Sequence, residues 1–76
     1  MTKWEYVFIS CVFHEDDWRP RWVNGDEIED WQHGDSIYEI SNKLGEESWE
    51  LVNLITDQGR VSASPNFRLV FKRTKD

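Results

Sequence analysis

The sequence predicts an α+β fold: an antiparallel β-sheet of three main strands plus a short acidic β-hairpin, with one α-helix packed on one face, in the order β-β-β-α-β-β. Three runs rich in aromatic and β-branched residues predict the main strands at 4–13, 49–56 and 67–73. A capped apolar stripe predicts the single helix at 36–44. A chain of 76 residues suits one small domain, 1–76, with a small core.

The first predicted strand is apolar on both faces. Alternation places Trp4, Tyr6 and Phe8 on one face, and Val7 and Ile9 on the other. A strand of this kind needs cover on both sides. We therefore expect it in the middle of the sheet.

A charged run and a proline divide the segment that follows. Residues 14–17 end the first strand, and Pro20 argues against a regular central strand around it, because proline cannot donate a backbone hydrogen bond. We expect a short edge strand at 19–23 instead. The dipeptide Asn24-Gly25 predicts a type I′ turn, since both residues tolerate a positive φ, and the return arm is 26–28.

The predicted helix carries signals at both ends. Ser36 and Glu39 have the spacing of a capping box, in which each side chain accepts a hydrogen bond from the other residue's backbone amide. Gly45 follows the apolar stripe, where a left-handed C′ position favours glycine. The stripe has the i, i+3, i+7 spacing of one buried face and consists of Ile37, Ile40 and Leu44.

One helix covers only one face of the sheet. We assign the larger apolar set to the helix side: Trp4, Tyr6, Phe8, Trp49, Leu51, Phe67, Leu69 and Phe71. The opposite face then has an apolar middle, which on a small protein is usually covered or used for binding. This predicted interaction surface comprises Val7, Ile9, Cys11, Phe13, Trp22, Val52, Leu54 and Val70. Either the hairpin arm with Trp22 or a second copy of the chain would cover it.

Composition narrows the classes of function. The single cysteine excludes an intramolecular disulfide and fits a reducing cytoplasm. The net charge of −6 disfavours nucleic acid as a partner, because phosphates need a basic surface. The chain begins without a signal-peptide pattern and has no apolar run long enough for a membrane helix, so we expect a cytoplasmic location and no membrane insertion.

The spacing of potential catalytic and metal-binding residues does not favour an active site or a metal site. His14, His33 and Asp35 are of metal-ligand types, but they lack the ligand spacing of a zinc site or a calcium loop. Cys11 lies inside a predicted strand, from which His14 would point to the opposite face. We therefore expect no catalytic residue, no metal site and no cofactor.

The acidic hairpin region offers an alternative ligand surface. Aromatic faces beside carboxylates suit cationic ligands or stacked sugars. The residues of this surface are Trp18, Trp22, Trp31, Asp26 and Glu29. The competing interpretation is that the tryptophans pack on the sheet or helix, because a small domain needs the buried area of its large aromatic side chains.

Three segments of the chain resemble a known pattern. They are 3–6 (Lys-Trp-Glu-Tyr), 44–52 (Leu-Gly-Glu-Glu-Ser-Trp-Glu-Leu-Val) and 71–73 (Phe-Lys-Arg). In this order they are similar to the small bacterial family called domain of unknown function 4177, whose pattern is W-E-Y, L-G-x-E-G-W-E-L-V and F-K-R. The resemblance implies the same small α+β fold and assigns no catalytic residue. The family usually has glycine where this chain has Ser48, and the acidic insert at 14–34 lengthens the first connection.

The apolar second face, the five tryptophans and the lack of catalytic groupings predict a protein that is not an enzyme. We expect a non-catalytic protein-interaction or structural module, which self-associates or serves as an accessory subunit of a bacterial assembly. The alternative is a small-ligand binder that uses the tryptophans and acidic residues at 14–35.

Overall fold

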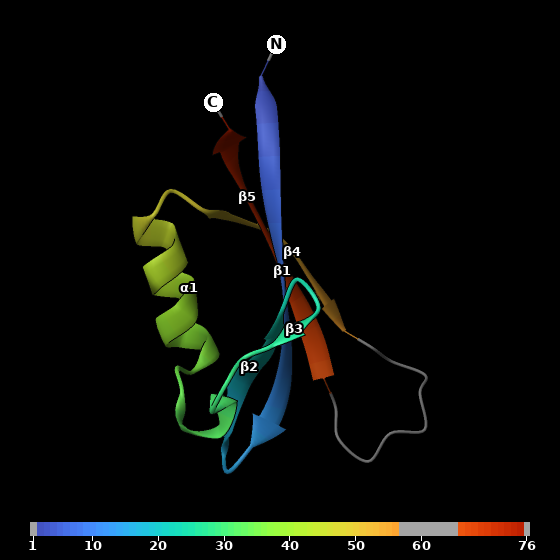
Figure 1. The fold of residues 1–76 in the computed structure, drawn as a ribbon, viewed down its shortest axis with the longest axis vertical. Coiled ribbons are helices and arrows are strands. Elements are labelled where there is room, and N and C mark those ends of the chain that lie inside the picture. The colour runs from blue at the N-terminus through green and yellow to red at the C-terminus, as the bar shows by residue number, and fades with distance from the viewer. Residues whose placement is uncertain (1, 57–65, 76) are drawn as a thin grey trace.

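The computed structural model describes residues 2–56 and 66–75, which form a five-stranded antiparallel sheet with one helix (Figure 1). The strands are β1 (Lys3–His14), β2 (Asp17–Val23), β3 (Asp26–Glu27), β4 (Glu50–Thr56) and β5 (Asn66–Lys75). Between β3 and β4 lie a 3₁₀ turn, η1 (Trp31–His33), and the helix α1 (Ile37–Glu46). The predicted fold class is confirmed. The connection between β4 and β5, residues 57–65, lies outside the described residues.

The strand order in the sheet is β3-β2-β1-β5-β4, so the first and last strands of the chain lie side by side at its centre. Strands β1 and β5 pair antiparallel from Lys3↔Lys75 to Val12↔Asn66. Figure 1 shows the two termini at the same end of this long central pair. Strand β4 is the last strand on the β5 side. The first strand is therefore central, as predicted.

Two tight turns build the β1–β2–β3 part of the sheet. Glu15 and Asp16 join β1 to β2 with φ values of 50° and 72°. Asn24 and Gly25 join β2 to β3 with φ values of 51° and 89°, as a type I′ turn requires. The Asn24 Oδ1 accepts a hydrogen bond from the Phe8 amide at 2.9 Å, and the Asn24 amide donates to the Phe8 carbonyl at 2.8 Å. These bonds fix the turn to the central strand.

Strand β2 begins at Asp17, earlier than predicted, and passes through Pro20. The expected start at residue 19 is wrong. Pro20 is tolerated because the outer neighbour β3 pairs only with Trp22 and Val23, so no described strand needs an amide from residue 20 on that side. The pairing register also shifts here, because Ser10 pairs with Trp22 and Cys11 pairs with Pro20, which leaves Arg21 as the extra residue of a bulge in β2.

The N-terminus of α1 has the predicted capping box. The Ser36 Oγ accepts a hydrogen bond from the Glu39 amide at 3.3 Å, and the Glu39 carboxylate accepts one from the Ser36 amide at 3.1 Å. Asp35, one residue earlier, binds Lys43 instead, with 2.8 Å between Oδ2 and Nζ. The apolar stripe packs against the core through the predicted residues Ile37, Ile40 and Leu44.

The helix ends two residues later than predicted, and its left-handed residue is a serine. Gly45 lies inside α1, while Ser48 has a φ of 72°. The Trp49 amide donates to the Leu44 carbonyl at 2.9 Å. The Ser48 amide donates to the Gly45 carbonyl at 3.1 Å, which completes the bonding pattern of a Schellman motif. The prediction that Gly45 is the left-handed C′ residue is therefore wrong. The Schellman motif at Ser48 lets Trp49 pack on the core together with Leu44.

This helix end makes two substitutions favourable. Ser48→Gly is expected to raise the free energy of unfolding by about 1 kcal/mol, because a left-handed conformation costs a non-glycine residue about that much. Gly45→Ala should raise it by about 0.5–1 kcal/mol, since a Cβ at this helical position meets nothing within 4 Å. Urea unfolding followed by tryptophan fluorescence measures both changes. Gly25→Ala is the control and should destabilise, because Gly25 needs its φ of 89°. Loss of stability in Ser48→Gly would contradict the assigned motif.

The core lies between α1 and one face of the sheet. Val7 pairs with Phe71 and Ile9 pairs with Leu69, so these four side chains share one face. The partly buried Phe67, Trp49 and the helix stripe pack against them. The fully or almost fully buried cluster consists of Val7, Ile9, Cys11, Leu69 and Phe71.

The aromatic side chains of β1 lie on the face opposite the core, in contrast to the prediction. Trp4, Tyr6 and Phe8 alternate with the buried residues, and all three are exposed. Their assignment to the helix side is therefore wrong. The smaller Val7 and Ile9 side chains lie under the helix, where they leave room for the apolar stripe of α1 beside the large ring of Phe71.

Candidate functional site

The face of the sheet opposite α1, here termed the open face, carries a row of exposed aromatic side chains. Trp4, Tyr6 and Phe8 alternate along β1 and are 43%, 50% and 49% exposed. Strand pairing places Val70 beside Phe8 and Lys72 beside Tyr6 on the same face. Alternate residues of a strand lie about 7 Å apart, so the row is about 14 Å long. Contiguous apolar surface of this kind is typical of a binding site.

Basic side chains border the aromatic row. The Lys72 Nζ lies 4.3 Å from the ring centre of Trp4, which is a cation–π contact. A hollow of about 450 Å³ opens at the other end of the row and is lined by Phe8, Ser10, Asn24, Gly25 and Arg68. The open face therefore combines apolar and positively charged groups in a chain whose net charge is −6.

The edge strand β4 is a second exposed apolar surface. All seven of its residues are exposed, and no described strand pairs with its outer edge. A register shift between Leu51 and Asn53 forms a bulge against β5. Its four large apolar side chains are between 44% and 50% exposed: Leu51, Val52, Leu54 and Ile55. An apolar edge of this kind is able to pair with another strand.

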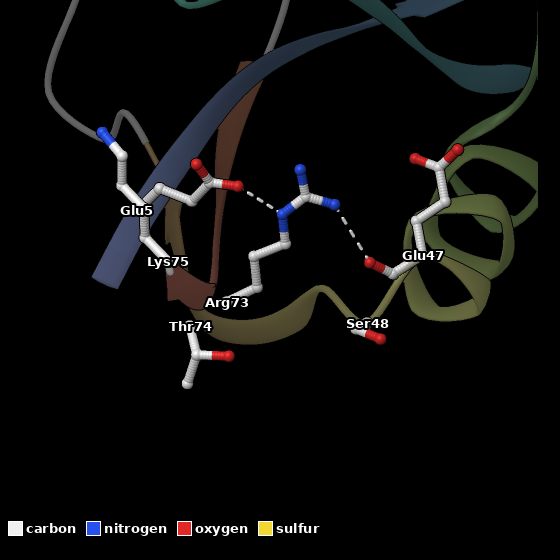
Figure 2. A pocket seen from close by; sticks show the side chains of 6 residues that line it. All are labelled: Glu5, Glu47, Ser48, Arg73, Thr74 and Lys75. Atoms are coloured by element: carbon white, nitrogen blue, oxygen red, sulfur yellow. Dashed lines mark hydrogen bonds and ion pairs between the residues drawn. The ribbon is translucent and has the colours of Figure 1, made fainter. Parts of the chain in front are cut away.

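Arg73 joins three parts of the chain at the end of the sheet that holds the termini. Figure 2 shows its guanidinium between Glu5 and Glu47. Its Nε forms an ion pair with the Glu5 carboxylate, and its Nη1 donates to the Glu47 carbonyl at 3.1 Å. The guanidinium also lies 4.3 Å from the ring centre of Trp49. A hollow of about 380 Å³ lies beside this structural junction, and Glu5 already neutralises the Arg73 side chain that lines it.

The segments 3–6, 44–52 and 71–73 meet at this junction. Each contributes a residue that contacts Arg73 or is Arg73 itself. These contacts hold the helix end and both central strands together. Sequence reasoning did not predict the role of Arg73.

The predicted interaction surface is divided by the fold. Val7, Ile9 and Cys11 are buried beneath α1 and are not available to a partner, so this part of the prediction is wrong. The reason is that α1 packs on the face of β1 that carries these three residues, whereas the prediction placed the helix on the opposite face. Val70 lies on the open face, but its neighbours leave only 9% of it exposed.

The other four residues of that prediction lie in two places. Val52 and Leu54 are exposed on β4. Phe13 is exposed near the end of β1, and Trp22 is half-buried in β2. Of the predicted surface, the edge strand β4 therefore remains a candidate for binding. On the central strand the exposed side chains are those of the aromatic row instead.

The alternative ligand surface already contains a cation from the same chain. The Arg21 guanidinium lies 4.6 Å from the ring centre of Trp22 and 4.8 Å from that of Trp31. Its Nε also donates to the Glu27 carboxylate at 2.9 Å. An external cationic ligand would have to displace Arg21 from both rings. The geometry therefore does not favour a cation site at Trp22 and Trp31.

The remaining residues of that surface do not complete a site. Trp18 packs against Phe13 and Phe67, with ring centres 5.2 Å and 4.6 Å apart. Trp31 is buried. Asp26 and Glu29 are exposed, and their carboxylates are not held against these rings by any described contact. Trp18 and Trp31 therefore contribute to packing in this fold.

The two histidines, His14 and His33, contact side chains of the same region. The His33 Nδ1 lies 2.8 Å from the Asp30 Oδ1, and this hydrogen bond raises the pKa of His33 above its usual value. His14 packs edge-on against Trp31, with 5.1 Å between ring centres. Within residues 2–56 and 66–75, no three His, Cys, Asp or Glu side chains gather into a potential metal site.

Cys11 is expected to be unreactive in the folded protein. Its side chain is fully buried, and burial raises the pKa of its thiol to about 12. Because the thiolate is the nucleophile, a disulfide reagent at mildly alkaline pH should react about 100-fold more slowly with the folded than with the urea-unfolded protein. Absorbance of the released reagent thiol measures both rates. Similar rates in the two states would show that the thiol is accessible.

Comparisons with known proteins add no assignment: no protein-family model, no curated protein and no solved structure matches the chain. The resemblance to the domain of unknown function 4177 therefore stays a prediction. In the part of the chain that the structure describes, no helix is long and apolar enough to span a membrane. The candidate surfaces are the open face and β4, because both expose large apolar side chains.

Proposed function

We propose that this chain is a non-catalytic protein-interaction module that binds another protein chain through its open face. The observation that carries the proposal is the row of half-exposed aromatic side chains on the central strand, Trp4, Tyr6 and Phe8. Aromatic side chains are enriched where protein surfaces meet. Lys72 and Arg68 beside the row give it a charge opposite to the net charge of the chain, which suits an acidic partner surface.

The size of the row decides how much of an interface it can supply. Burying the exposed half of three aromatic side chains removes roughly 300 Å² from water, which contributes roughly 7 kcal/mol at about 25 cal/mol per Å². Association itself costs about 4–15 kcal/mol. The row therefore anchors an interface, and additional contacts must stabilise the complex.

A hydrophobic dye tests whether the row is an accessible binding surface. We expect the folded protein to enhance the fluorescence of anilinonaphthalene sulfonate, and Phe8→Thr combined with Tyr6→Thr to remove most of that signal. Tyr38→Thr is the matched control, because Tyr38 is 66% exposed on α1, away from the row. Equal dye signals from the wild type and the double variant would contradict the proposal.

The partner is either a second copy of the chain or another subunit of a bacterial assembly, and the location that we propose is the cytoplasm. Light scattering after gel filtration over a range of concentrations measures self-association. A strict monomer at high concentration that also fails to bind the dye would overturn the proposal. Binding of a fluorescent single-stranded oligonucleotide at physiological salt, without self-association, would contradict protein as the partner class.

A further inference from the structure

We propose that strand β4 is the site at which a second copy of the chain binds. In this arrangement two β4 strands pair antiparallel, edge to edge, and join two five-stranded sheets into one sheet of ten strands. The inference goes beyond the proposed function, because the proposed function concerns the open face and the pairing concerns the edge of the sheet. It uses the surface that the aromatic row leaves free.

The backbone of β4 is suited to strand addition. Its seven residues span about 23 Å, and the N–H and C=O groups that point away from β5 face no described strand. Figure 1 shows β4 leading away from the end of α1. The helix therefore does not cover the full length of this edge.

The distribution of charge favours a second copy as the partner. The chain has nine basic and 15 acidic residues, so two copies repel each other over most of their surface. Residues 51–56, in contrast, are Leu-Val-Asn-Leu-Ile-Thr and carry no charged side chain. The one charged residue of β4 is Glu50 at its start. Antiparallel pairing places the two Glu50 side chains at opposite ends of the interface, where they do not face each other.

Symmetry gives the pair a defined and closed form. Identical strands that pair antiparallel in one sheet are related by a twofold axis perpendicular to that sheet, so each copy uses the same surface and the assembly stops at two. Both α1 helices then lie on one side of the joined sheet. Both aromatic rows lie on the other side, where they form one larger binding face.

Two features of β4 limit the strength of the pair. The bulge at Val52 interrupts the regular spacing of the strand. The Leu54 amide already donates to the Asn53 Oδ1 at 2.8 Å. The interface is therefore short, at the small end of the range for specific complexes, and we expect a dissociation constant in the micromolar range.

Sedimentation velocity over a concentration series tests the pairing. We expect a monomer–dimer equilibrium for the wild type and a dimerisation constant weakened about tenfold or more in Leu54→Lys, because a lysine on an edge strand opposes pairing. Tyr38→Lys is the matched control, since it adds the same charge at an exposed position of α1. Ile55→Lys replaces Leu54→Lys if circular dichroism shows that the latter is unfolded.

Cysteine cross-linking locates the interface. Single cysteines are introduced at each position from 51 to 56, and the buried Cys11 gives a low background. Under mild oxidation we expect the yield of disulfide-linked dimer to peak at one position, where the strand meets its own copy, and to fall on both sides. Tyr38→Cys should give little dimer. A uniform yield across β4 and Tyr38→Cys would contradict the pairing.

The outcomes separate this inference from the proposed function. If the wild type dimerises and Leu54→Lys dimerises equally well, while the Tyr6 and Phe8 double variant does not, the open face is the interface and the β4 pairing is overturned. Growth of larger oligomers with concentration would overturn the closed pair. A monomer that still binds dye through the aromatic row overturns the pairing and leaves the proposed function standing.

Discussion

Phe71→Ala is expected to lower the free energy of unfolding by about 3–5 kcal/mol, because the Phe71 side chain is 2% exposed in the centre of the core. The ring pairs across the sheet with Val7 and belongs to the cluster against which α1 packs. Alanine would leave a cavity that the paired strands cannot close. A domain of this size has a net stability of similar magnitude, about 3–5 kcal/mol. The variant should therefore be largely unfolded, which far-UV circular dichroism measures.

Phe8→Ala is the matched control for this substitution. It removes the same atoms from the neighbouring strand β1, but Phe8 is 49% exposed on the open face. We expect a loss of about 1 kcal/mol or less. Phe71→Leu, with an expected loss of about 1.5 kcal/mol, keeps the comparison quantitative when Phe71→Ala does not fold. All urea curves should be recorded at one protein concentration, because self-association adds to the apparent stability. Equal losses at Phe71 and Phe8 would show that the faces of β1 are assigned wrongly.

The features that the sequence predicts correctly depend on residues a few positions apart. The Asn24-Gly25 turn needs two residues that accept a positive φ, and both have one. The capping box needs only Ser36 and Glu39 at their fixed spacing. The central place of β1 follows from apolar side chains on both of its faces.

The choice between the two faces of β1 is a different kind of problem. Alternation divides the strand into two largely apolar sets, and within the strand only the difference between Ser10 and Cys11 indicates which set lies under the helix. The decision comes from pairing with β5, which places Lys72 beside Tyr6 and Arg68 beside Ser10. The polar Ser10 in the aromatic set and Cys11 in the other were the sequence signal that the aromatic set faces outward.

The candidate site was predictable only in part. The apolar residues of β4 are evident in the sequence, but their exposure follows from the place of β4 at the edge of the sheet. That place is set by the pairing of β4 with β5, which the residues of β4 alone do not define. The Arg73 junction is even less local, because Arg73 and Glu5 are 68 positions apart. Such contacts require knowledge of the strand order.

Arg73→Ala is expected to lower the free energy of unfolding by about 2 kcal/mol. The contributions are roughly 0.5 kcal/mol from the partly exposed ion pair with Glu5, about 1 kcal/mol from the bond to the Glu47 carbonyl and about 0.5–1 kcal/mol from the contact with Trp49. Urea unfolding measures the loss. Lys75→Ala is the matched control, because it removes the same charge from the exposed end of β5 and should change stability by less than about 0.5 kcal/mol.

Two further variants separate the parts of the Arg73 junction. Arg73→Lys keeps the charge but cannot reach Glu5 and the Glu47 carbonyl with one planar group, so we expect about half of the loss seen with alanine. A double-mutant cycle of Arg73→Ala with Glu5→Gln should give a coupling of about 0.5 kcal/mol that decreases as salt is added. A coupling near zero together with a loss below about 0.5 kcal/mol for Arg73→Ala would show that the junction does not hold the helix end to the sheet.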